Sequence, residues 1–389
     1  MKILILASRF PYPLEKGDKL RLYHQIKALS QAYELVLCAL SDEKVDEKSL
    51  AEMSQFCHKI YILSFSKFSI LTNIWSIFLS KTPLSVLYFY HFRLQKKINR
   101  IVSEELPDHI YCQLIRCSEY VKDVPIPKTI DFMDDFATIM SRRANQSSFL
   151  KKWFFKWESS KIVYYQNKIL KKFNSHTIIS TSDKDSIALD VKNTLSVIPN
   201  GIDLEYFYPQ EEGSDKKYDL VFVGNMGYHP NVEAAKILVE KICPLVRKSF
   251  PQLSILIAGV RPTNEVLALK SQNIYVTGWL EDIRIAYASS KIMVVPNFLG
   301  AGQQNKIMEA MAMGLPCVTT DLVNSSYNAT DNEQIMIGNS VQELAAKIII
   351  LMTDQIIYKK LSRNGLLFVQ SEYSWAKSGA HLEKLLSKE

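Results

Sequence analysis

The sequence predicts an α/β protein built from two Rossmann-like, doubly wound domains. Short, nearly continuous apolar runs alternate with helical patterns, which is typical of parallel sheets covered by helices on both faces. This alternation occurs twice, and the two sets meet near residue 200. The length of 389 residues also favours two domains, because a domain usually holds about 100–200 residues.

The first half begins with a strand at residues 2–7. Apolar residues at steps of three to four then predict an amphipathic helix over residues 18–32. Further short strands are expected at residues 35–40, 60–63, 109–113, 129–132, 176–180 and 195–199. We take residues 1–200 as the first domain.

The second half repeats the pattern, and several of its strands end in glycine. Strands are expected at 219–224, 253–259, 273–278, 291–296, 317–320 and 334–337, with helices at 231–248, 281–289 and 303–313. Ligands of such sheets bind in the crevice at the carboxyl ends of the strands. We take residues 201–370 as the second domain and residues 371–389 as a C-terminal helix.

Composition and charge limit the classes of protein and of binding partner that the sequence allows. A hydrophobic fraction of 47% and a charged fraction of 22% exclude a disordered or fibrous chain. The excess positive charge lies in residues 1–200, where 29 Lys and Arg stand against 20 Asp and Glu. Such a domain suits an anionic partner, for example a phosphate-bearing lipid, a membrane surface or a nucleic acid. Solvated surface lysines would explain the same excess.

The cysteines and the apolar segments predict the compartment. None of the six cysteines has CxxC spacing or a histidine at metal-ligand spacing, so we expect no metal and a reducing, cytoplasmic location. The first apolar run is followed by Arg9 and reads as a strand instead of a signal peptide. Residues 68–92 are the nearest candidate for a membrane span, but Asn73, Lys81 and Pro83 interrupt them, so no span is expected.

The most informative stretch is a loop with glycines that joins the strand at 291–296 to the helix expected from residue 303. Gly300 and Gly302 would let backbone N–H groups approach a ligand, and the helix N-terminus would attract an anion. Lys306 lies in the first turn, where a cation is unfavourable unless a phosphate neutralises it. Glu309 is one turn further and could accept from two ribose hydroxyls. A capped surface helix with an ordinary Lys–Glu pair would also fit.

Glu309 opens the run EAMAMGLPCV, which resembles the donor-binding motif of the retaining GT-B glycosyltransferases of family 4. Shorter motifs resemble the same family and occur in its order: VIPNGID at 197–203 with Phe207, FVG at 222–224, GWLED at 278–282 and YSW at 373–375. The opening PYP at 11–13, followed by KGDKLR and His24, resembles one subgroup of that family. The resemblance extends over nearly the whole chain.

The resemblance implies a GT-B fold, in which two Rossmann-like domains face a central cleft and the C-terminal helix crosses back to the first domain. It implies no metal and no cofactor, and a UDP- or GDP-linked sugar as the donor substrate. Lys306, Glu309 and Asp134 are the expected catalytic residues. The expected contacts to the nucleotide sugar are Gly17, Asn200, Gly224, Asn225, Gly300, Ala301, Gly302, Gln303, Gln304, Asn305, Lys306 and Glu309.

Two departures from the family pattern concern the donor. Ala301 stands where many members carry a first glutamate, so a carboxylate that faces the sugar is absent. Residues 225–231 contain no Lys or Arg, whereas many members bind the diphosphate with both there. Neutralisation would then depend on Lys306 and backbone amides, with help from Arg261.

The first domain departs from the pattern after its strand at 129–132. Members often place a histidine there, but this chain has Asp131 and Asp134, either of which could hold a sugar hydroxyl or the acceptor. Asp134 or Asp135 could instead cap the helix that follows. Lys19 and Arg21 could bind an anionic donor or acceptor, or could simply be solvated.

Basic and aromatic residues are interleaved between Arg142 and Lys172. This segment holds nine basic residues and a single acid, Glu158, together with Trp153, Trp157 and other aromatics. The pattern is typical of a helix that lies at an anionic membrane surface. Aromatics packed on the domain, with solvated lysines, would fit equally. No RNA-binding module accompanies the segment, so no nucleic-acid partner is expected.

The resemblance therefore implies a retaining hexosyltransferase-type enzyme. It would transfer a sugar from a nucleotide-diphosphate sugar to a hydroxyl of a glycan or a lipid-linked glycan, in cell-surface polysaccharide synthesis at the inner face of a bacterial membrane. Two alternatives stay open. One is a GT-B nucleotide-sugar epimerase. The other is a degenerate GT-B protein that binds or scaffolds without catalysis, which Ala301 and the missing basic residues would fit.

Overall fold

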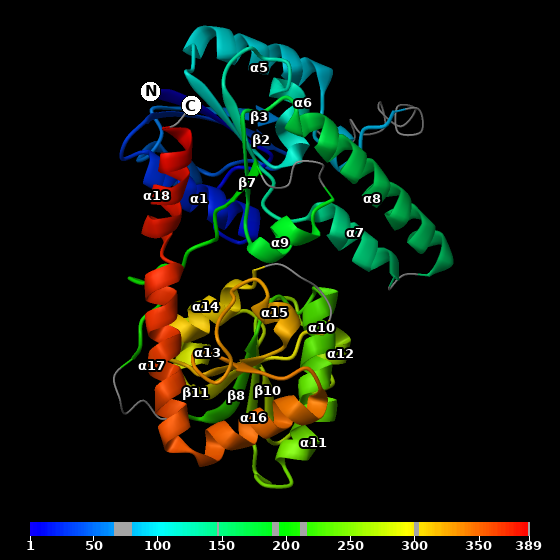
Figure 1. Ribbon diagram of the computed structural model, residues 1–389, viewed down its shortest axis with the longest axis vertical. Helices are drawn as coiled ribbons and strands as arrows, with labels where there is room; N and C mark the ends of the chain where they lie inside the picture. Colours follow the sequence, from blue (N-terminus) through cyan, green and yellow to red (C-terminus); the bar gives the residue numbers. More distant parts are fainter. Residues whose placement is uncertain (66–79, 146–147, 189–193, 211–215, 299–302, 388–389) are drawn as a thin grey trace. The chain divides into compact units, whose positions relative to one another are not determined.

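The computed structural model divides the chain into two compact units (Figure 1). Unit 1 comprises Met1–Pro199 and Trp375–Glu389, and unit 2 comprises Asn200–Ser374. The structure describes residues 1–65, 80–145, 148–188, 194–210, 216–298 and 303–387. Each unit contains one parallel sheet, which confirms the predicted α/β class with two Rossmann-like domains.

The sheet of unit 1 has seven parallel strands in the order β3-β2-β1-β4-β5-β6-β7. Their bounds are β1 Lys2–Ala7, β2 Glu34–Ser41, β3 Lys59–Ser64, β4 His109–Gln113, β5 Lys128–Asp131, β6 Ser175–Ile178 and β7 Leu195–Val197. β1 from Ile3 to Ala7 and β2 from Leu35 to Leu40 are apolar and buried without interruption, as expected where helices cover both faces of a sheet.

Alternate residues of β1 enter two separate cores. Ile3 and Ile5 belong to the core with helices α1 (Gly17–Leu29), α2 (Glu47–Ser54) and α18 (Trp375–Leu386). Leu4 and Leu6 face the opposite core, with α4 (Leu84–Leu87), α5 (Phe92–Glu105), α6 (Ser118–Val121), α7 (Phe136–Asn145) and α8 (Phe149–Leu170). The described part of the unit also contains the short segments η2 (Ile115–Cys117) and α9 (Thr181–Ser186). The period of two along β1 therefore sorts the apolar side chains between two helix layers.

The C-terminal helix α18 belongs to unit 1, where it packs on α1. The ring of His24 stacks on that of Trp375, with centroids 4.3 Å apart and planes 7° apart. A Cβ on Gly379 would lie 2.4 Å from Cβ of Ala28, so only glycine permits this close helix approach.

The sheet of unit 2 has six parallel strands in the order β10-β9-β8-β11-β12-β13. Their bounds are β8 Tyr218–Val223, β9 Ile255–Ala258, β10 Ile274–Val276, β11 Ser290–Val295, β12 Cys317–Thr319 and β13 Met336–Ile337. The helices are α10 His229–Lys236, α11 Cys243–Val246, α12 Asn264–Leu267, α13 Arg284–Ala288, α14 Asn305–Ala312, α15 Asp321–Asn324, α16 Val341–Thr353 and α17 Gln355–Glu372. The apolar side chains of these helices and strands pack together in one core.

The helix predicted at 231–248 is interrupted. A π-helical segment, Ile237–Ile242, separates α10 from α11, and Pro244 occupies the first turn of α11. Proline lacks the N–H that a continuous α-helix would use, so the local hydrogen-bond pattern shifts before it.

In each sheet the first strand lies between the second and the fourth. The order therefore reverses between β1 and β4 in unit 1 and between β8 and β11 in unit 2. The crevice at the carboxyl ends of such a pair is where doubly wound sheets bind ligands. Both units have such a place, and the residues that border it follow the strand ends in sequence.

The apolar stretch at 68–92 is only partly described, since residues 66–79 lie outside the described ranges. Its described part contains α4. Across the ranges that the structure describes, no helix has the length and apolar character to span a membrane.

Candidate functional site

Two glycines at the carboxyl edge of the unit 2 sheet bring neighbouring strand ends into close contact. Gly224 follows β8 and Gly259 follows β9, and the N–H of Gly224 donates to the carbonyl of Ala258 at 3.0 Å. Gly259 has φ +138°, and a Cβ there would lie 1.8 Å from the carbonyl oxygen of Gly224. Only glycine fits at 259, so the loop after β8 is held against the end of β9.

The missing side chain of Gly224 leaves room for two polar groups. A Cβ on Gly224 would lie 2.8 Å from Nδ2 of Asn231 and 3.0 Å from Nζ of Lys306. The Lys306 ammonium donates to Oδ1 of Asn231 at 2.8 Å and lies 4.7 Å from the centroid of the Phe222 ring. Asn231 in turn donates to the carbonyl of Asn225 at 3.0 Å. The structure thus brings Gly224, Asn225 and Lys306 together, and their contact with a nucleotide sugar stays a prediction.

Lys306 and Glu309 lie one turn apart on α14, but each has a different partner. The hydroxyl of Tyr287, on α13, donates to Oε2 of Glu309 at 2.6 Å. Among the described residues no ion pair within 4.0 Å joins Lys306 to Glu309. The alternative of an ordinary surface Lys–Glu pair is therefore wrong. Tyr287 fixes the carboxylate and Asn231 fixes the ammonium.

Both charged groups have perturbed pKa values. Burial lowers the pKa of Lys306 to about 7, and the nearby Glu309 carboxylate offsets only part of this effect. Burial also raises the pKa of Glu309, against the opposing effects of the Tyr287 hydrogen bond and Lys306. A cation with so low a pKa lacks a full counter-charge, and an anion bound beside it would supply one.

The start of α14 carries three further predicted residues. Oε1 of Gln303 accepts from the backbone N–H of Asn200 at 2.9 Å, and Nε2 of Gln303 donates to the carbonyl of Asn200 at 3.3 Å. Asn200 also donates to Oδ1 of Asn305 at 3.5 Å. The carbonyl of Gln304 accepts from the hydroxyl of Tyr327. These bonds fix the chain on both sides of the α14 N-terminus, within unit 2.

Two buried amide oxygens near this N-terminus make no hydrogen bond with the described residues. They are Oε1 of Gln304 and Oδ1 of Asn297, the latter two positions after the end of β11. Asn297 is 2% exposed, so its oxygen is shielded from water. The predicted contacts Gly300, Ala301 and Gly302 fall between these residues but lie outside the described ranges.

Gly17 and Asp134 belong to unit 1, at the carboxyl edge of its own sheet. Gly17 is the first residue of α1, and a Cβ there would lie 3.4 Å from Cε of Met133, an ordinary contact. Asp134 follows β5 and is half-buried. Burial, with the negative charge of Asp183 next in importance, raises the pKa of Asp134 to about 7. Its proton therefore titrates near neutrality.

The capping alternative applies to Asp135 and not to Asp134. Oδ1 of Asp135 accepts from the N–H of Thr138 at 3.1 Å at the start of α7, and Oδ2 of Asp135 accepts from Ser186 at 3.0 Å. No hydrogen bond to the Asp134 carboxylate is found among the described residues.

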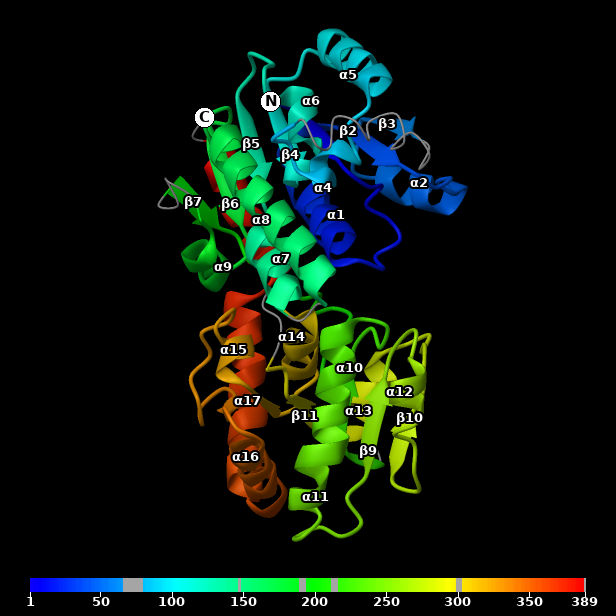
Figure 2. The ribbon, with the colours of Figure 1, turned by 90° about the vertical axis from the view of Figure 1, so that its right-hand side faces the viewer.

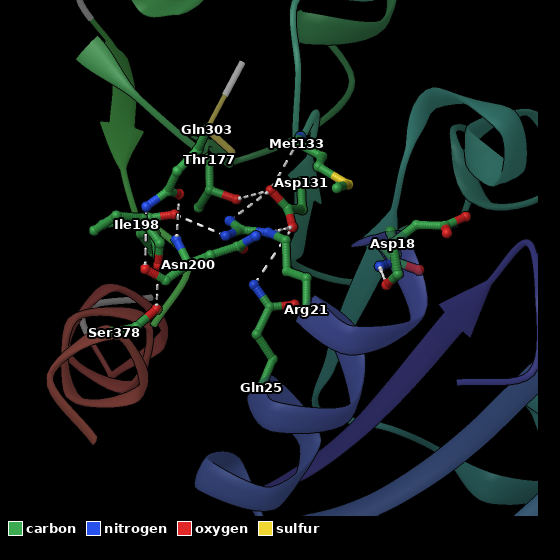
Figure 3. A network of polar contacts seen from close by, with 12 residues as sticks. Asp18, Arg21, Gln25, Asp131, Met133, Thr177, Ile198, Asn200, Gln303 and Ser378 are labelled. Carbon is green, nitrogen blue, oxygen red and sulfur yellow. Dashed lines mark hydrogen bonds and ion pairs between the residues drawn. The ribbon is translucent and has the colours of Figure 1, made fainter. Parts of the chain in front are cut away.

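The prediction that Arg21 and Asp131 could bind a ligand is wrong, because the two side chains bind each other (Figure 3). Both are fully buried, with Nε of Arg21 2.7 Å from Oδ2 of Asp131. Arg21 also donates to the carbonyl of Ile198 at 2.8 Å, and Asp131 accepts from the hydroxyl of Thr177 at 2.8 Å. The pair joins α1 to the ends of β5, β6 and β7.

Sequence reasoning missed three residues that shape the unit 2 site. Tyr287 and Tyr327 lie in segments without any motif, and Asn231 was seen only as a residue that is not basic. A signal for Asn231 exists in hindsight, since it lies in the first turn of α10, the helix that follows the glycine of the FVG motif. No comparable signal marks either tyrosine, because their hydroxyls reach the site from α13 and from the segment after α15.

The large cavity of unit 2, the cysteines and the distribution of metal-ligating side chains give no further support for a site at the carboxyl edge of the unit 2 sheet. A cavity of about 1050 Å³ in unit 2 lies beside Asp219 and Lys291, at the start of β8 and β11, and hence at the opposite edge of the sheet. All six cysteines are buried and unpaired. Within the described ranges, no three His, Cys, Asp or Glu side chains gather in a way that could hold a metal ion.

Comparison with known proteins points to one class of enzyme. Residues 217–354 match the model of the family described as glycosyl transferases group 1. A Klebsiella pneumoniae protein described as an uncharacterized 44.6 kDa protein in the cps region is 23% identical over 390 residues, 96% of each chain. An Escherichia coli enzyme, UDP-Gal:alpha-D-GlcNAc-diphosphoundecaprenol alpha-1,3-galactosyltransferase, is 29% identical over 160 residues, which cover 36% of this chain and 39% of that enzyme.

Solved structures show the same fold across the whole chain. Sucrose-phosphate synthase from Thermosynechococcus elongatus superposes with a TM-score of 0.73 at 12% identity, covering 100% of this chain and 99% of that chain. Anabaena HepE, solved with UDP and glucose, gives a TM-score of 0.69 at 14% identity and covers 100% of both chains. The chain therefore has the two Rossmann-like domains of the GT-B fold, and its residues 217–354 match the family model of group 1 glycosyltransferases.

Proposed function

We propose that the protein is a retaining glycosyltransferase of family 4. It transfers a sugar from a nucleotide-diphosphate sugar, UDP- or GDP-linked, to a hydroxyl of a glycan or lipid-linked glycan in cell-surface polysaccharide synthesis. One observation carries the proposal: the Lys306 ammonium sits on Asn231 in the space beside Gly224, one helical turn before the Glu309 carboxylate that Tyr287 orients. The names of the K. pneumoniae and E. coli relatives support the polysaccharide and lipid-linked context.

Lys306 and the N-terminus of α14 are suited to a diphosphate. The first-turn N–H groups of this eight-residue helix and the Lys306 ammonium provide positive charge at one place. When the bond from the sugar to the diphosphate breaks, negative charge grows on the leaving oxygen, and preorganised donors stabilise that charge. Gly300, Ala301 and Gly302 would contribute backbone N–H groups, whereas Gly224, whose own N–H donates to the carbonyl of Ala258, would contribute the space that Lys306 occupies. No metal or cofactor enters this proposal.

Glu309 is suited to a ribose. Its carboxylate can accept from two neighbouring hydroxyls, and the Tyr287 hydrogen bond holds one oxygen at 2.6 Å so that the other stays oriented. Asn200, Gln303 and Asn305 position the start of α14 through the bonds they make to one another. Oε1 of Gln304 makes no hydrogen bond with the described residues and could accept one from the ligand.

Asp134 is the proposed catalytic group of unit 1. Because its pKa is raised to about 7, the carboxyl group exists in both protonation states near neutral pH. It can therefore accept a hydrogen bond from a sugar hydroxyl or donate one. Gly17, at the N-terminus of α1, would leave room for a phosphate.

The segment between Arg142 and Lys172 is the proposed contact to an anionic membrane, on the cytoplasmic side. α7 and α8 form a hairpin (Figure 2), and α8 buries Ile162 and Ile169 in the core of unit 1. Its N-terminal part exposes 86% of Phe149 and 68% of Trp153 beside the basic residues. Exposed aromatics beside positive charge complement an anionic lipid surface.

Sedimentation with vesicles tests the membrane contact. Wild-type protein should sediment with phosphatidylglycerol vesicles at low salt and much less with phosphatidylcholine vesicles. Trp153→Ser should weaken sedimentation, whereas Trp279→Ser, which removes a tryptophan 69% exposed in unit 2, should not. Equal loss in both variants, or none in either, would contradict the contact.

Nucleotide binding tests the donor site. We expect thermal stability to rise with one base among UDP, GDP, ADP, CDP and TDP, by about 2.7 kcal/mol at a hundredfold excess over Kd. Glu309→Ala should abolish the shift, while Glu240→Ala, at an exposed site of unit 2, should leave it unchanged. The matching nucleotide sugars are then incubated with and without glycan acceptors.

The outcomes separate the alternatives. Transfer to an acceptor with retained anomeric configuration supports the proposal, and transfer with inversion contradicts its stereochemistry. Conversion of the sugar without an acceptor would identify an epimerase. The absence of a shift with every nucleotide would favour a non-catalytic binding protein.

A further inference from the structure

A second pocket, of about 390 Å³, opens in unit 1. Its walls combine three charged side chains, Arg9, Asp42 and Arg116, with Ser85 and the rings of Tyr88 and Phe89. The volume lies within the range of small-molecule sites. None of these residues takes part in the function proposed above.

The pocket lies where the topology of the unit 1 sheet predicts a ligand. Arg9 follows β1, Asp42 directly follows β2, and Arg116 lies in η2 after β4. β1 is between β2 and β4, and the strand order reverses between β1 and β4. The charged groups thus come from the carboxyl ends of three adjacent strands at the switch point.

The two guanidinium groups share one carboxylate. Oδ2 of Asp18 forms an ion pair with Arg9 and lies 3.6 Å from Nη1 of Arg116. Nη1 of Arg116 is buried and makes no hydrogen bond with any described residue. The Arg116 guanidinium is 5.4 Å from the centroid of the Phe89 ring and 5.8 Å from that of Phe136. Arg9 and Arg116 thus share the Asp18 carboxylate, and Nη1 of Arg116 keeps a buried donor that no described residue uses.

The wall that α4 and the residues after it supply is fixed and partly aromatic. Glu158, on α8, accepts from the backbone N–H groups of Leu84 and Ser85, both at 3.1 Å, and so anchors α4. Oγ of Ser85 is buried without a hydrogen-bond partner among the described residues. The rings of Tyr88 and Phe89 meet edge to face, with centroids 4.9 Å apart. The pocket therefore offers a ring surface and an unused hydroxyl.

We infer that this pocket binds an anionic sugar of the acceptor, one that carries a phosphate or a carboxylate. Arg9 and Arg116 would hold the anion, Asp42 and Ser85 would bind sugar hydroxyls, and Tyr88 with Phe89 would pack on the ring. A site for a free anion alone would not include the Asp42 carboxylate. A site for a neutral sugar would not need two arginines, Arg9 and Arg116, that share the single carboxylate of Asp18. This inference rests on the proposed function, since it assigns the acceptor of the same transferase.

Calorimetric titration with glucose 1-phosphate tests the inference, with UDP present in excess so that the donor site is occupied. Methyl glucoside, inorganic phosphate and glucuronate are titrated in parallel. Wild type should bind glucose 1-phosphate or glucuronate more tightly than it binds methyl glucoside or inorganic phosphate. Whichever of glucose 1-phosphate and glucuronate binds more tightly shows whether the pocket prefers a phosphate or a carboxylate. Arg9→Gln and Arg116→Lys should weaken that binding about 10- to 100-fold.

Arg100→Gln is the matched control, because it removes an exposed arginine of the same unit, whose side chain is 80% exposed and pairs with Glu104. Its binding should equal that of wild type. Arg9, whose side chain is 32% exposed, can be replaced with less effect on folding than Arg116, and melting curves verify that the variants are folded. Unchanged binding in folded Arg9→Gln would overturn the inference, and so would equally tight binding of methyl glucoside.

The failure of this inference is distinct from that of the proposed function. If UDP binds in a Glu309-dependent manner but no anionic sugar binds, the pocket assignment is wrong and the transferase proposal stands. If no nucleotide binds but glucose 1-phosphate binding depends on Arg9, the pocket is a binding site and the transferase proposal fails.

Discussion

The Lys306 ammonium lies 2.8 Å from Oδ1 of Asn231, in space that exists because residue 224 has no side chain. This relationship links two motifs that are about eighty residues apart in the sequence. The glycine after β8 and the lysine at the start of α14 depend on each other: a larger residue at 224 would occupy the position of the ammonium. Their coupling leads to the first prediction.

Gly224→Ala should impair nucleotide binding more than it impairs folding. The added Cβ meets only the ends of two flexible side chains, Nδ2 of Asn231 at 2.8 Å and Nζ of Lys306 at 3.0 Å, so both can move aside. Moving Lys306 removes the charge that faces the diphosphate. We expect the Kd for the nucleotide to rise about tenfold or more, as when a hydrogen bond to a charged group is lost. Calorimetry checks the affinity, and a melting temperature that falls with unchanged Kd would contradict the prediction.

Gly259→Ala should have the opposite profile. A Cβ there would lie 1.8 Å from the backbone oxygen of Gly224, and the residue has φ +138°. Backbone cannot move aside as a side chain end can, so we expect a loss of about 3 kcal/mol or more in the free energy of unfolding. Urea denaturation of the two glycine variants side by side measures the contrast. Equal stability of both variants would show that the strand ends are not packed as described.

Nucleotide-sugar affinity should fall as pH rises above 7. The pKa of Lys306 is lowered to about 7 by burial, so in the free protein the amine loses its proton above that pH. A bound diphosphate favours the charged form and raises the pKa, so binding above pH 7 must take up a proton. The Kd should then increase up to about tenfold per pH unit above 7. Calorimetry of a nucleotide sugar, whose diphosphate does not titrate between pH 6 and 9, measures this.

Lys306→Gln is the control for that pH dependence. The variant should bind more weakly at pH 6.5, and its Kd should depend much less on pH than that of the wild type, because only Asp134 then remains as a proposed donor contact with a pKa of about 7. A pH dependence that persists in the variant would assign the titration to another residue.

The fold was predictable because its determinants are local in sequence. The run at Lys2–Ala7 is apolar on both faces, as a central strand of a covered parallel sheet must be, and it forms β1 with those bounds. The helix over 231–248 was predicted as continuous, because the spacing of apolar residues does not distinguish an α-helix from the short π-helical segment before Pro244. A proline near the end of a helical pattern marks where such an adjustment is needed.

The site was only partly predictable because partners come from distant segments. Lys306 and Glu309 stand out through motif and spacing, but Tyr287 and Asn231 become visible only when the chain is folded. Arg21 illustrates the opposite error. A basic residue in the first turns of α1 reads as an exposed anion ligand, yet it is fully buried and paired with Asp131, which is 110 residues away. An ion pair between residues so far apart in the sequence cannot be predicted from local sequence patterns.

Asp134→Asn should stabilise the protein at neutral pH. The pKa of Asp134 is raised to about 7 in the folded state, above the ordinary value of 3.8. Between pH 4 and 7 the unfolded state has therefore lost the proton that the folded state still holds, and stability falls as pH rises through this window. Removing the titration should raise the free energy of unfolding by about 2 kcal/mol at pH 8, a value discounted because the group is partly exposed. The gain should vanish below pH 4.

Asp135→Asn is the neighbouring comparison. Asp135 caps α7 and accepts from Ser186, and Asn retains a capping oxygen but loses the charge. We expect stability at pH 8 to stay the same or to fall by up to about 1 kcal/mol. Urea denaturation from pH 4 to pH 8 checks both variants, and a pH-independent gain in Asp134→Asn would contradict the assigned titration.

Arg21→Ala should destabilise unit 1 strongly. Nε and Nη2 of Arg21 lie 2.7 and 3.1 Å from the two carboxylate oxygens of Asp131, and both side chains are fully buried. Burial and the pairing with Arg21 act in opposite directions on Asp131, and its pKa is lowered overall, so the carboxylate is charged at neutral pH. Removing the guanidinium leaves this charge buried and without its ion-pair partner, which costs about 3–5 kcal/mol of unfolding free energy. A double-mutant cycle with Asp131→Asn and Arg21→Met should recover part of the loss, because the double variant leaves no buried charge. If Arg21→Ala instead kept the melting temperature and lost only binding of anionic ligands, the arginine would be a ligand contact and the structural role described for it would be wrong.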